Sequence, residues 1–394
     1  YSLPQAEAFS YDGVNGRGSG GSASAFAQVF NTLGKYQPYG VYVPHTGAPY
    51  GLQMEWHGSN QGQVGQINQP GMQSEFGEQL DRLLVTPEAR GPNGYGSDIS
   101  ERDLLDVMSD ITATLPVDPN RVFSSGYSQG GYITFRMAML FPQVFAGFTA
   151  WVGFTGDDLN GTGAPDGVGV TAGAVGNMIN YVGNLRHVPG SMIYGAEDEL
   201  VPVTSSHAMQ QAFAATDDVY QWYLHTTAEH LTFAALDDWR KEAAYSAGQR
   251  RVTAPARVTF RTDPFLDAPA YGIRHDRAYW VSAIRGQNPG WIDTDLTSHG
   301  CGGSNPQFTT GNGAGPSPVP WVSIYQAVSG RTAAPATPML EGTLHNLRSA
   351  HIDTRATCLG GGFAYSIQSD AAGVLTLSDG RQIPLHDGLN TGSV

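Results

Sequence analysis

The sequence predicts an α/β protein with a doubly wound, mainly parallel sheet, followed by a smaller β-rich, sandwich-like domain. Two observations predict this. Up to about residue 250, short strand-like runs alternate with helix-like segments, as is typical of a parallel sheet covered on both faces. Beyond residue 251, short β-like runs alternate with turns rich in Gly, Pro and Asn. The length of 394 residues suits one large domain and a smaller one.

One helix is predicted over residues 100–114, because apolar residues recur there on one helical face. Asp103, Asp106 and Asp110 share the opposite face, and we expect these carboxylates to be exposed to solvent. The same reasoning predicts the other elements. They are strands over residues 39–44, 52–56, 83–87, 121–125, 148–152, 192–194 and 220–224, and helices over residues 132–140 and 204–214.

Changes in composition predict the domain organisation. Residues 1–35 form a Gly- and Ser-rich segment, residues 36–250 the α/β domain, and residues 256–394 the β-rich domain. Within the α/β domain, residues 156–187 are rich in Gly, Ala and Asn. We expect an insertion there over the carboxyl edge of the sheet, where ligand-binding loops lie.

Charge and hydropathy exclude two classes of partner. The formal net charge of −14 repels phosphate backbones, so we expect no nucleic-acid partner. No stretch approaches the roughly 20 apolar residues that span a bilayer, so we expect a soluble protein without a membrane span. The chain starts at Tyr1 without Met, and we expect a processed product that lost a signal sequence or an upstream domain. The sequence leaves the oligomeric state open.

The two cysteines, Cys301 and Cys358, both lie in the C-terminal third. A metal or redox pair is one interpretation, but neither cysteine belongs to a C-x-x-C motif, and His299 alone does not complete a zinc site. We therefore expect a disulfide in a loop-rich, secreted domain, and no metal. Such a bridge would stabilise the fold by about 4 kcal/mol through the entropy of the unfolded chain.

The strongest local signal is Gly126-x-Ser128-x-Gly130, which lies between the predicted strand 121–125 and the predicted helix 132–140. A serine hydroxyl is a weak nucleophile unless a sharp turn exposes it beside a base. Glycines on both sides permit that turn, since bulkier residues would collide with the sheet and the helix. The pattern predicts that Ser128 is a nucleophile. The alternative is a glycine-rich turn with an idle serine.

A second motif, His57-Gly58-Ser59, follows the predicted strand 52–56. Acyl transfer needs two backbone N–H groups that bind the oxyanion. We expect them from Ser59 and from Gln129, the residue after the nucleophile. His57 precedes the nucleophile in the chain, which is the wrong order for the base of such a fold. We therefore expect His57 to shape this substrate-binding loop.

The third motif supplies an acid after the predicted strand 192–194. Glu197, Asp198 and Glu199 compete for this role, and the G-x-x-D-x-x-V-P spacing favours Asp198. A carboxylate at the carboxyl end of a strand can orient a histidine and stabilise its imidazolium. Asp157 and Asp158, which follow the preceding strand, are the alternative acids.

The fourth motif supplies a base after the predicted strand 220–224. His225 abuts the strand, whereas His230 lies farther along the loop and can reach over the sheet edge. We therefore expect His230 to be the base, which gives the chain order Ser128, Asp198, His230. Aromatic residues near the nucleophile could line the substrate pockets together with the insertion and with residues 91–97. They are Tyr127, Trp151 and Phe154, although Trp151 also suits the core.

Residues from about 39 to 240 resemble the branch of the α/β-hydrolases that contains polyhydroxybutyrate depolymerases and feruloyl esterases, and also the catalytic domain of prolyl-oligopeptidase-like enzymes. The resemblance implies an α/β-hydrolase fold and a serine hydrolase that acts through an acyl-enzyme without a metal or cofactor. The matching residues are His57-Gly58-Ser59, Gly126-Tyr127-Ser128-Gln129-Gly130-Gly131, Asp198 with Val201-Pro202, and His230.

The combined expectation is a secreted bacterial hydrolase that cleaves carboxylic esters, either small molecules or polymers. A peptidase or amidase is the alternative within the hydrolases. The alternative from another class is a non-catalytic protein that binds a polymer or cell wall through residues 256–394, because a fold alone does not guarantee activity.

Overall fold

The computed structural model describes residues 37–91, 95–156 and 174–394. The predicted N-terminal segment and residues 157–173 of the predicted insertion lie outside these ranges. Every strand and helix predicted between residues 39 and 224 overlaps an observed element. No helix in the described ranges is long and apolar enough to cross a membrane. The elements up to residue 246 are β2 (Tyr39–Tyr42), β3 (Tyr50–Trp56), η1 (Gln66–Asn68), α3 (Pro70–Met72), η2 (Gln73–Glu78), β4 (Arg82–Pro87), α4 (Ile99–Thr114), β5 (Val117–Tyr127), α5 (Gln129–Leu140), β6 (Gly147–Trp151), η3 (Ala174–Gly176), η4 (Met178–Leu185), β7 (Gly190–Gly195), α6 (Val203–Ala214), β8 (Tyr220–His225), α7 (Thr232–Leu236) and α8 (Arg240–Ser246).

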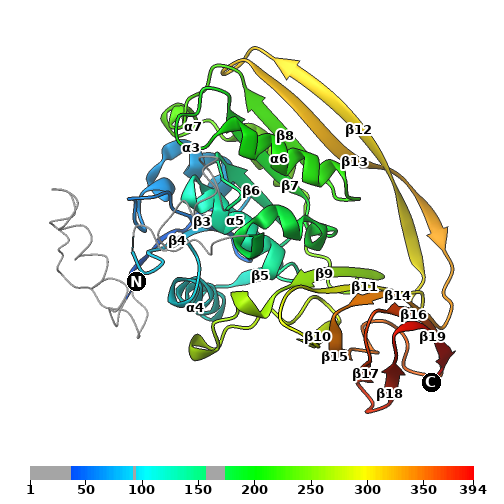
Figure 1. The fold of residues 1–394 in the computed structure, drawn as a ribbon. Coiled ribbons are helices and arrows are strands. Elements are labelled where there is room, and N and C mark those ends of the chain that lie inside the picture. The colour runs from blue at the N-terminus through cyan, green and yellow to red at the C-terminus, as the bar shows by residue number, and fades with distance from the viewer. Residues whose placement is uncertain (1–36, 92–94, 157–173) are drawn as a thin grey trace.

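The elements after residue 256 are nearly all strands, as predicted. Most of them lie at the lower end of the molecule in Figure 1, and the long hairpin β12–β13 extends away from this end. These elements are β9 (Arg257–Thr262), η5 (Pro264–Leu266), η6 (Pro269–Tyr271), β10 (Val281–Gly286), β11 (Ile292–Ser298), β12 (Gly303–Gly315), β13 (Trp321–Ala334), β14 (Met339–His345), β15 (Leu347–Ile352), β16 (Ala364–Ser369), β17 (Gly373–Leu377), β18 (Gln382–Leu385) and β19 (Gly388–Ser393).

The large sheet confirms the predicted fold class. In the described part of the chain it has nine strands in the order β12-β13-β8-β7-β6-β5-β3-β4-β2. The six strands from β8 to β4 are mutually parallel, whereas β2 pairs antiparallel with β4. This strand order, with one antiparallel strand at the end beside β4, is that of the α/β-hydrolase fold. The carboxyl ends of β3, β5, β7 and β8 therefore meet at one edge, where ligands bind in open α/β sheets.

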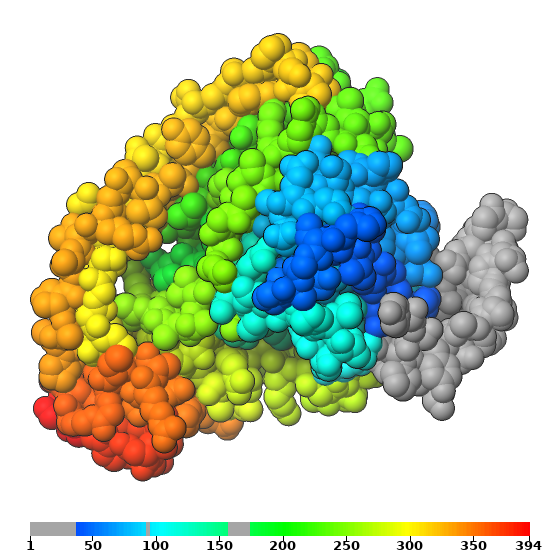
Figure 2. All heavy atoms as spheres, turned by 180° about the vertical axis from the view of Figure 1, so that it is seen from behind, coloured from blue at the N-terminus to red at the C-terminus, as the bar shows by residue number. Residues whose placement is uncertain are grey.

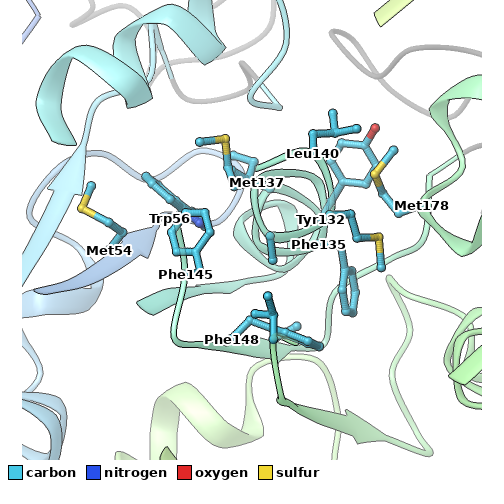
Figure 3. Packing of buried hydrophobic residues seen from close by; sticks show 14 of the residues in the cluster. Met54, Trp56, Tyr132, Phe135, Met137, Leu140, Phe145, Phe148 and Met178 are labelled. Atoms are coloured by element: carbon cyan, nitrogen blue, oxygen red, sulfur yellow. The ribbon is translucent and has the colours of Figure 1, made fainter. Parts of the chain in front are cut away.

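Side chains of the parallel strands alternate between two apolar cores, one on each face of the sheet. In β7, Met192 and Tyr194 belong to one core, and Ile193 belongs to the other. The first core surrounds α5 and includes residues of α4, η4 and α6 (Figure 3). The second core lies under η2, α7 and α8. Because both faces are covered, most side chains of these strands are buried.

The β-rich region contains two sheets that share one core. A four-stranded sheet has the order β10-β15-β17-β18, and a five-stranded sheet has the order β19-β16-β14-β11-β9 in the described chain. Apolar residues from both sheets pack together, for example Ile352 and Leu375 from the first with Phe260 and Leu340 from the second. This arrangement agrees with the predicted sandwich-like, β-rich region.

The hairpin β12–β13 joins the large sheet rather than the other C-terminal strands. Its strand β13 pairs antiparallel with β8, with Trp321 opposite His225 and Gln326 opposite Tyr220. The hairpin arches over the molecule, and Figure 2 shows an opening between the arch and the body. Without this pairing β8 would expose the hydrogen-bonding groups of a sheet edge, so the hairpin covers that edge. The sequence did not predict that β13 pairs with β8.

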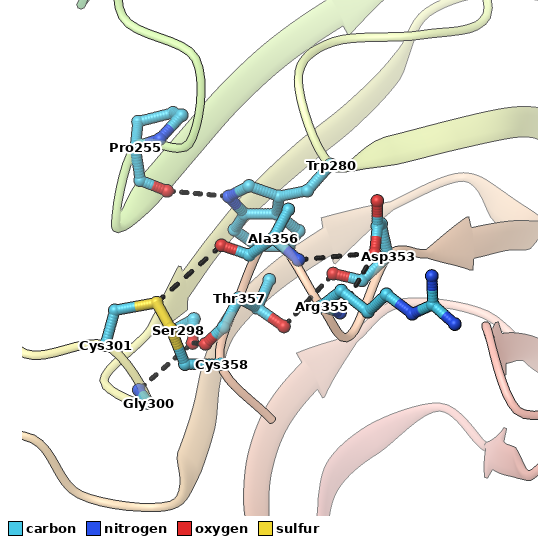
Figure 4. The surroundings of a disulfide bond; sticks show 10 residues. All are labelled: Pro255, Trp280, Ser298, Gly300, Cys301, Asp353, Arg355, Ala356, Thr357 and Cys358. Carbon is cyan, nitrogen blue, oxygen red and sulfur yellow. Dashed lines mark hydrogen bonds between the residues drawn. A yellow bond between two sulfur atoms is a disulfide. The ribbon is translucent and has the colours of Figure 1, made fainter. Parts of the chain in front are cut away.

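Cys301 and Cys358 form a disulfide, as predicted. A hydrogen bond also joins the two segments, since Ser298 Oγ donates to the Thr357 carbonyl oxygen at 2.8 Å (Figure 4). In the turn before Cys358, Asp353 Oδ1 accepts from two backbone N–H groups. The bridge therefore ties two turns that the chain itself holds in shape.

The prediction that Asp103 is exposed was wrong. Its side chain is fully buried, and the guanidinium of Arg90 lies 3.7 Å from its carboxylate. Burial raises the pKa of Asp103 to about 7. Asp106 and Asp110 are not buried, so only one carboxylate of the predicted polar face points inward. The sequence spacing of α4 does not show that Arg90, from a loop, covers this part of the helix.

Candidate active site

Ser128 occupies a sharp turn between β5 and α5. Its φ of 58° and ψ of −115° are strained for a residue with a side chain. Such strain costs about 1–3 kcal/mol and persists only where the surroundings enforce it. Here the backbone N–H of Ser128 donates to the Trp151 carbonyl oxygen at 2.9 Å. The residue is half-buried at the carboxyl edge of the sheet, so its hydroxyl is presented at a position suited to a nucleophile.

The glycines around Ser128 are required by close backbone contacts. A Cβ atom on Gly130 would lie 1.8 Å from the Trp56 carbonyl oxygen, and one on Gly126 would lie 2.5 Å from the Gly130 carbonyl oxygen. A Cβ atom on Gly131 would lie 2.5 Å from the Cα atom of Gly153. The motif therefore lets β3, β5 and α5 approach one another closely enough to form the turn.

His230 and Asp198 are joined side chain to side chain. His230 Nδ1 lies 2.8 Å from Asp198 Oδ2 and 2.9 Å from Oδ1, and the two side chains are only 3% and 1% exposed. Asp198 Oδ1 also accepts from the backbone N–H groups of Leu200 and Val201 at 2.9 and 2.7 Å. These bonds fix the carboxylate. A carboxylate beside Nδ1 accepts a hydrogen bond from Nδ1–H, which leaves Nε2 of a neutral imidazole as the basic nitrogen.

The other candidates for acid and base lie elsewhere. His225 is buried against Phe233, with ring centroids 4.9 Å apart, and burial lowers its pKa to about 4. Glu197 is exposed, while Glu199 Oε2 accepts from the backbone N–H of His230 at 3.3 Å. The alternative acids Asp157 and Asp158 lie outside the described residues. Of the described candidates, only Asp198 contacts the imidazole of His230.

The described residues show no direct hydrogen bond between the side chains of Ser128 and His230. Their link runs through Tyr127, whose hydroxyl donates to the main-chain carbonyl oxygen of His230. Catalytic hydrogen bonds are often long in a protein without substrate and tighten when substrate binds. The sequence did not predict this role for the Tyr127 hydroxyl.

Ser59 and Gln129 meet beside the nucleophile. Ser59 Oγ donates to Gln129 Oε1 at 3.1 Å, so the loop after β3 is tied to the first residue of α5. In the described part of the chain, neither backbone N–H has an acceptor. Free N–H groups at a helix N-terminus and an adjoining loop suit the binding of a developing negative charge.

The predicted substrate-binding residues are all largely buried. His57 places its two ring nitrogens near the carbonyl oxygens of Gly58 and Glu88, at 2.9 and 3.1 Å, which holds the loop. Tyr127 is 5% exposed, and its ring contacts that of His230 edge-on. Both side chains therefore hold main chain beside the site.

Trp151 and Phe154 lie on opposite faces of the large sheet. Trp151 is 1% exposed and packs edge-on against Trp239 in the core under α8. Phe154 stacks on Tyr132 and meets Tyr95 edge-on. Tyr95 was not singled out in the sequence, although it belongs to the predicted pocket loop 91–97. Its hydroxyl lies 3.5 Å from Ser59 Oγ, so this tyrosine adjoins the loop after β3.

The described residues contain no group of three or more His, Cys, Asp or Glu side chains placed to hold a metal ion.

No family model matches the chain, and no curated protein matches its sequence. Solved structures align with 55% of it, and the alignment spans 60% of the first of them. The identities of 14–19% and the TM-scores of 0.42–0.46 are too low to transfer the substrates or reactions of these proteins to this chain. Three of them are a thermostable esterase (19% identity, TM-score 0.42), an S-formylglutathione hydrolase from Agrobacterium tumefaciens (16% identity, 92% of that chain, TM-score 0.45) and a fluorophosphonate-binding serine hydrolase from Staphylococcus aureus (14% identity, 94% of that chain, TM-score 0.46).

Proposed function

We propose that the protein is a secreted serine hydrolase that cleaves carboxylic esters through an acyl-enzyme. The observation that carries the proposal is the buried His230–Asp198 pair at the same sheet edge as the strained Ser128 turn. Strained backbone at a strand-to-helix turn, a histidine oriented by a fixed carboxylate, and free N–H groups nearby are the parts that acyl transfer requires.

In the proposed reaction, Ser128 Oγ attacks the ester carbonyl carbon while His230 Nε2 takes its proton. Asp198 stabilises the imidazolium that forms. The N–H groups of Ser59 and Gln129 bind the oxyanion, each contributing roughly 3 kcal/mol to the transition state. His230 then donates the proton to the leaving alcohol. In the second half of the reaction, water attacks the acyl carbonyl carbon while His230 takes its proton, and His230 then returns this proton to Ser128 Oγ as the carboxylic acid leaves.

The C-terminal region has a structural role in this proposal. We assign residues 36–250 to a catalytic domain and residues 256–394 to a β-rich domain. Its hairpin β12–β13 covers the edge of the large sheet, and the disulfide favours an oxidising compartment. Oligomeric state does not enter the proposal.

A substrate panel tests the ester assignment. The purified protein is incubated with p-nitrophenyl esters of increasing acyl length and with the matching p-nitroanilides. The proposal expects turnover of esters, with a burst of p-nitrophenol equal to the enzyme concentration when deacylation is slow. Faster turnover of anilides would favour a peptidase or amidase. Turnover of neither class would favour a non-catalytic binding protein.

A further inference from the structure

The bond between Tyr127 and His230 connects the end of β5 to the loop after β8. Tyr127 is the last residue of β5 and the immediate neighbour of Ser128. Its hydroxyl donates to the main-chain carbonyl oxygen of His230, 103 residues farther along the chain. The two rings meet edge-to-face, with centroids 5.9 Å apart and an interplanar angle of 84°. The side chain therefore contacts the proposed base through both its ring and its hydroxyl.

The surroundings of His230 explain why this bond matters. His230 lies in the loop between β8, which ends at His225, and α7, which begins at Thr232. Its imidazole is held by Asp198, and its backbone N–H donates to Glu199. Both of these partners belong to the loop after β7. Of these three contacts, only the Tyr127 bond comes from the strand that carries the nucleophile.

The Tyr127 hydroxyl is also a permanent donor. Burial is the main reason that its pKa lies well above the ordinary value of 10, so the phenol stays protonated throughout the working range of an imidazole base. Its single proton is committed to the His230 carbonyl oxygen, which leaves none for a substrate. A role in lining the substrate pocket, which the sequence suggested, would require the ring to be accessible, but the residue is 5% exposed.

We propose that Tyr127 is a positioning residue whose hydroxyl holds the main chain of His230 at a fixed place relative to Ser128. This inference rests on the proposed function and adds the link between nucleophile and base. Loss of the hydroxyl would leave the Asp198–His230 pair intact but free to shift as a unit. A displacement of the order of 1 Å at a reacting group costs up to about 100-fold in rate.

The test compares Tyr127→Phe with a matched control. Tyr279→Phe removes the same kind of bond, from a tyrosine hydroxyl to the Pro142 carbonyl oxygen at 3.1 Å, at the junction with the β-rich region. Ester turnover and the rate of Ser128 labelling by a fluorophosphonate are measured for both. We expect Tyr127→Phe to lower kcat and the labelling rate by about 10- to 100-fold with KM unchanged. Tyr279→Phe should leave all three within about twofold.

Three results would overturn the inference. The first is a Tyr127→Phe variant with wild-type kcat and labelling rate. The second is a rise in KM alone, which would indicate a substrate contact. The third concerns rescue: p-aminophenylalanine at position 127 keeps a donor at the same place, and it should restore kcat to within about threefold even if Tyr127→Phe folds poorly. Failure of this rescue would contradict the inference. A wild-type protein that neither labels nor turns over esters would overturn the proposed function itself.

Discussion

Replacement of Asp198 by asparagine separates the orienting role of this carboxylate from its role in the fold. Asp198 Oδ1 accepts from the backbone N–H groups of Leu200 and Val201, and an asparagine oxygen can accept both bonds. The new amide nitrogen then faces His230 Nδ1, 2.8 Å from the present Oδ2. Because an amide N–H can only donate there, the variant favours the tautomer that carries its proton on Nε2, where it blocks the base.

The size of the effect follows from this change of tautomer. In a serine protease, the equivalent substitution lowers kcat by about 10⁴-fold, which corresponds to about 5.4 kcal/mol of transition-state free energy. We expect a similar loss for Asp198→Asn. The free energy of unfolding should change by less than about 1 kcal/mol, because the backbone bonds remain.

The assay is steady-state hydrolysis of a p-nitrophenyl ester, with urea denaturation as the stability measurement. Glu197→Gln is the matched control, since it removes an exposed carboxylate from the preceding residue. The control should keep kcat within about twofold of wild type. A loss smaller than about tenfold for Asp198→Asn, or an equal loss for both variants, would refute the assignment of Asp198 as the orienting acid.

Three further predictions concern stability and the turn. Burial raises the pKa of Glu242 from 4.5 to about 7, so its contribution to stability is present below pH 4.5 and is lost as the pH rises through 7. Between pH 4.5 and pH 8, the free energy of unfolding of Glu242→Gln should fall by up to about 3 kcal/mol less than that of the wild type. If the substitution shifts the urea midpoint by the same amount at both pH values, the prediction is contradicted. The Cys301→Ala/Cys358→Ala pair should lower the free energy of unfolding by about 4 kcal/mol, because the bridge spans 57 residues. Gly130→Ala should abolish fluorophosphonate labelling, since its Cβ would overlap the Trp56 carbonyl oxygen.

The features that the sequence predicts well depend on local pattern or on strand order. The turn at Ser128 follows from glycines at fixed spacing after an apolar strand. The contact between Asp198 and His230 could be expected, because the ends of parallel strands meet at one sheet edge, whatever the distance along the chain. The backbone bonds of Asp198 to Leu200 and Val201 account for the spacing that distinguished it from Glu197 and Glu199.

The features that the sequence missed depend on contacts between distant segments. Nothing in the sequence of β13 indicates that it pairs with β8, since an exposed strand can cover any sheet edge of suitable length. The spacing of Asp103 predicts a polar face, but Arg90 covers it in the structure. The hydroxyl of Tyr127 reaches His230 because β5 and the loop after β8 lie side by side in the fold. The hydrophobic periodicity of the sequence contains no information about such a contact between distant segments.

The central claim is that Ser128 is an activated nucleophile. Its most direct test is incubation of the wild-type protein and of Ser128→Ala with a fluorophosphonate, followed by intact mass measurement. The account predicts a single phosphonyl adduct on the wild-type protein, located at Ser128 by peptide mapping, and no adduct on the variant. An unlabelled wild-type protein, or equal labelling of both proteins, would contradict it.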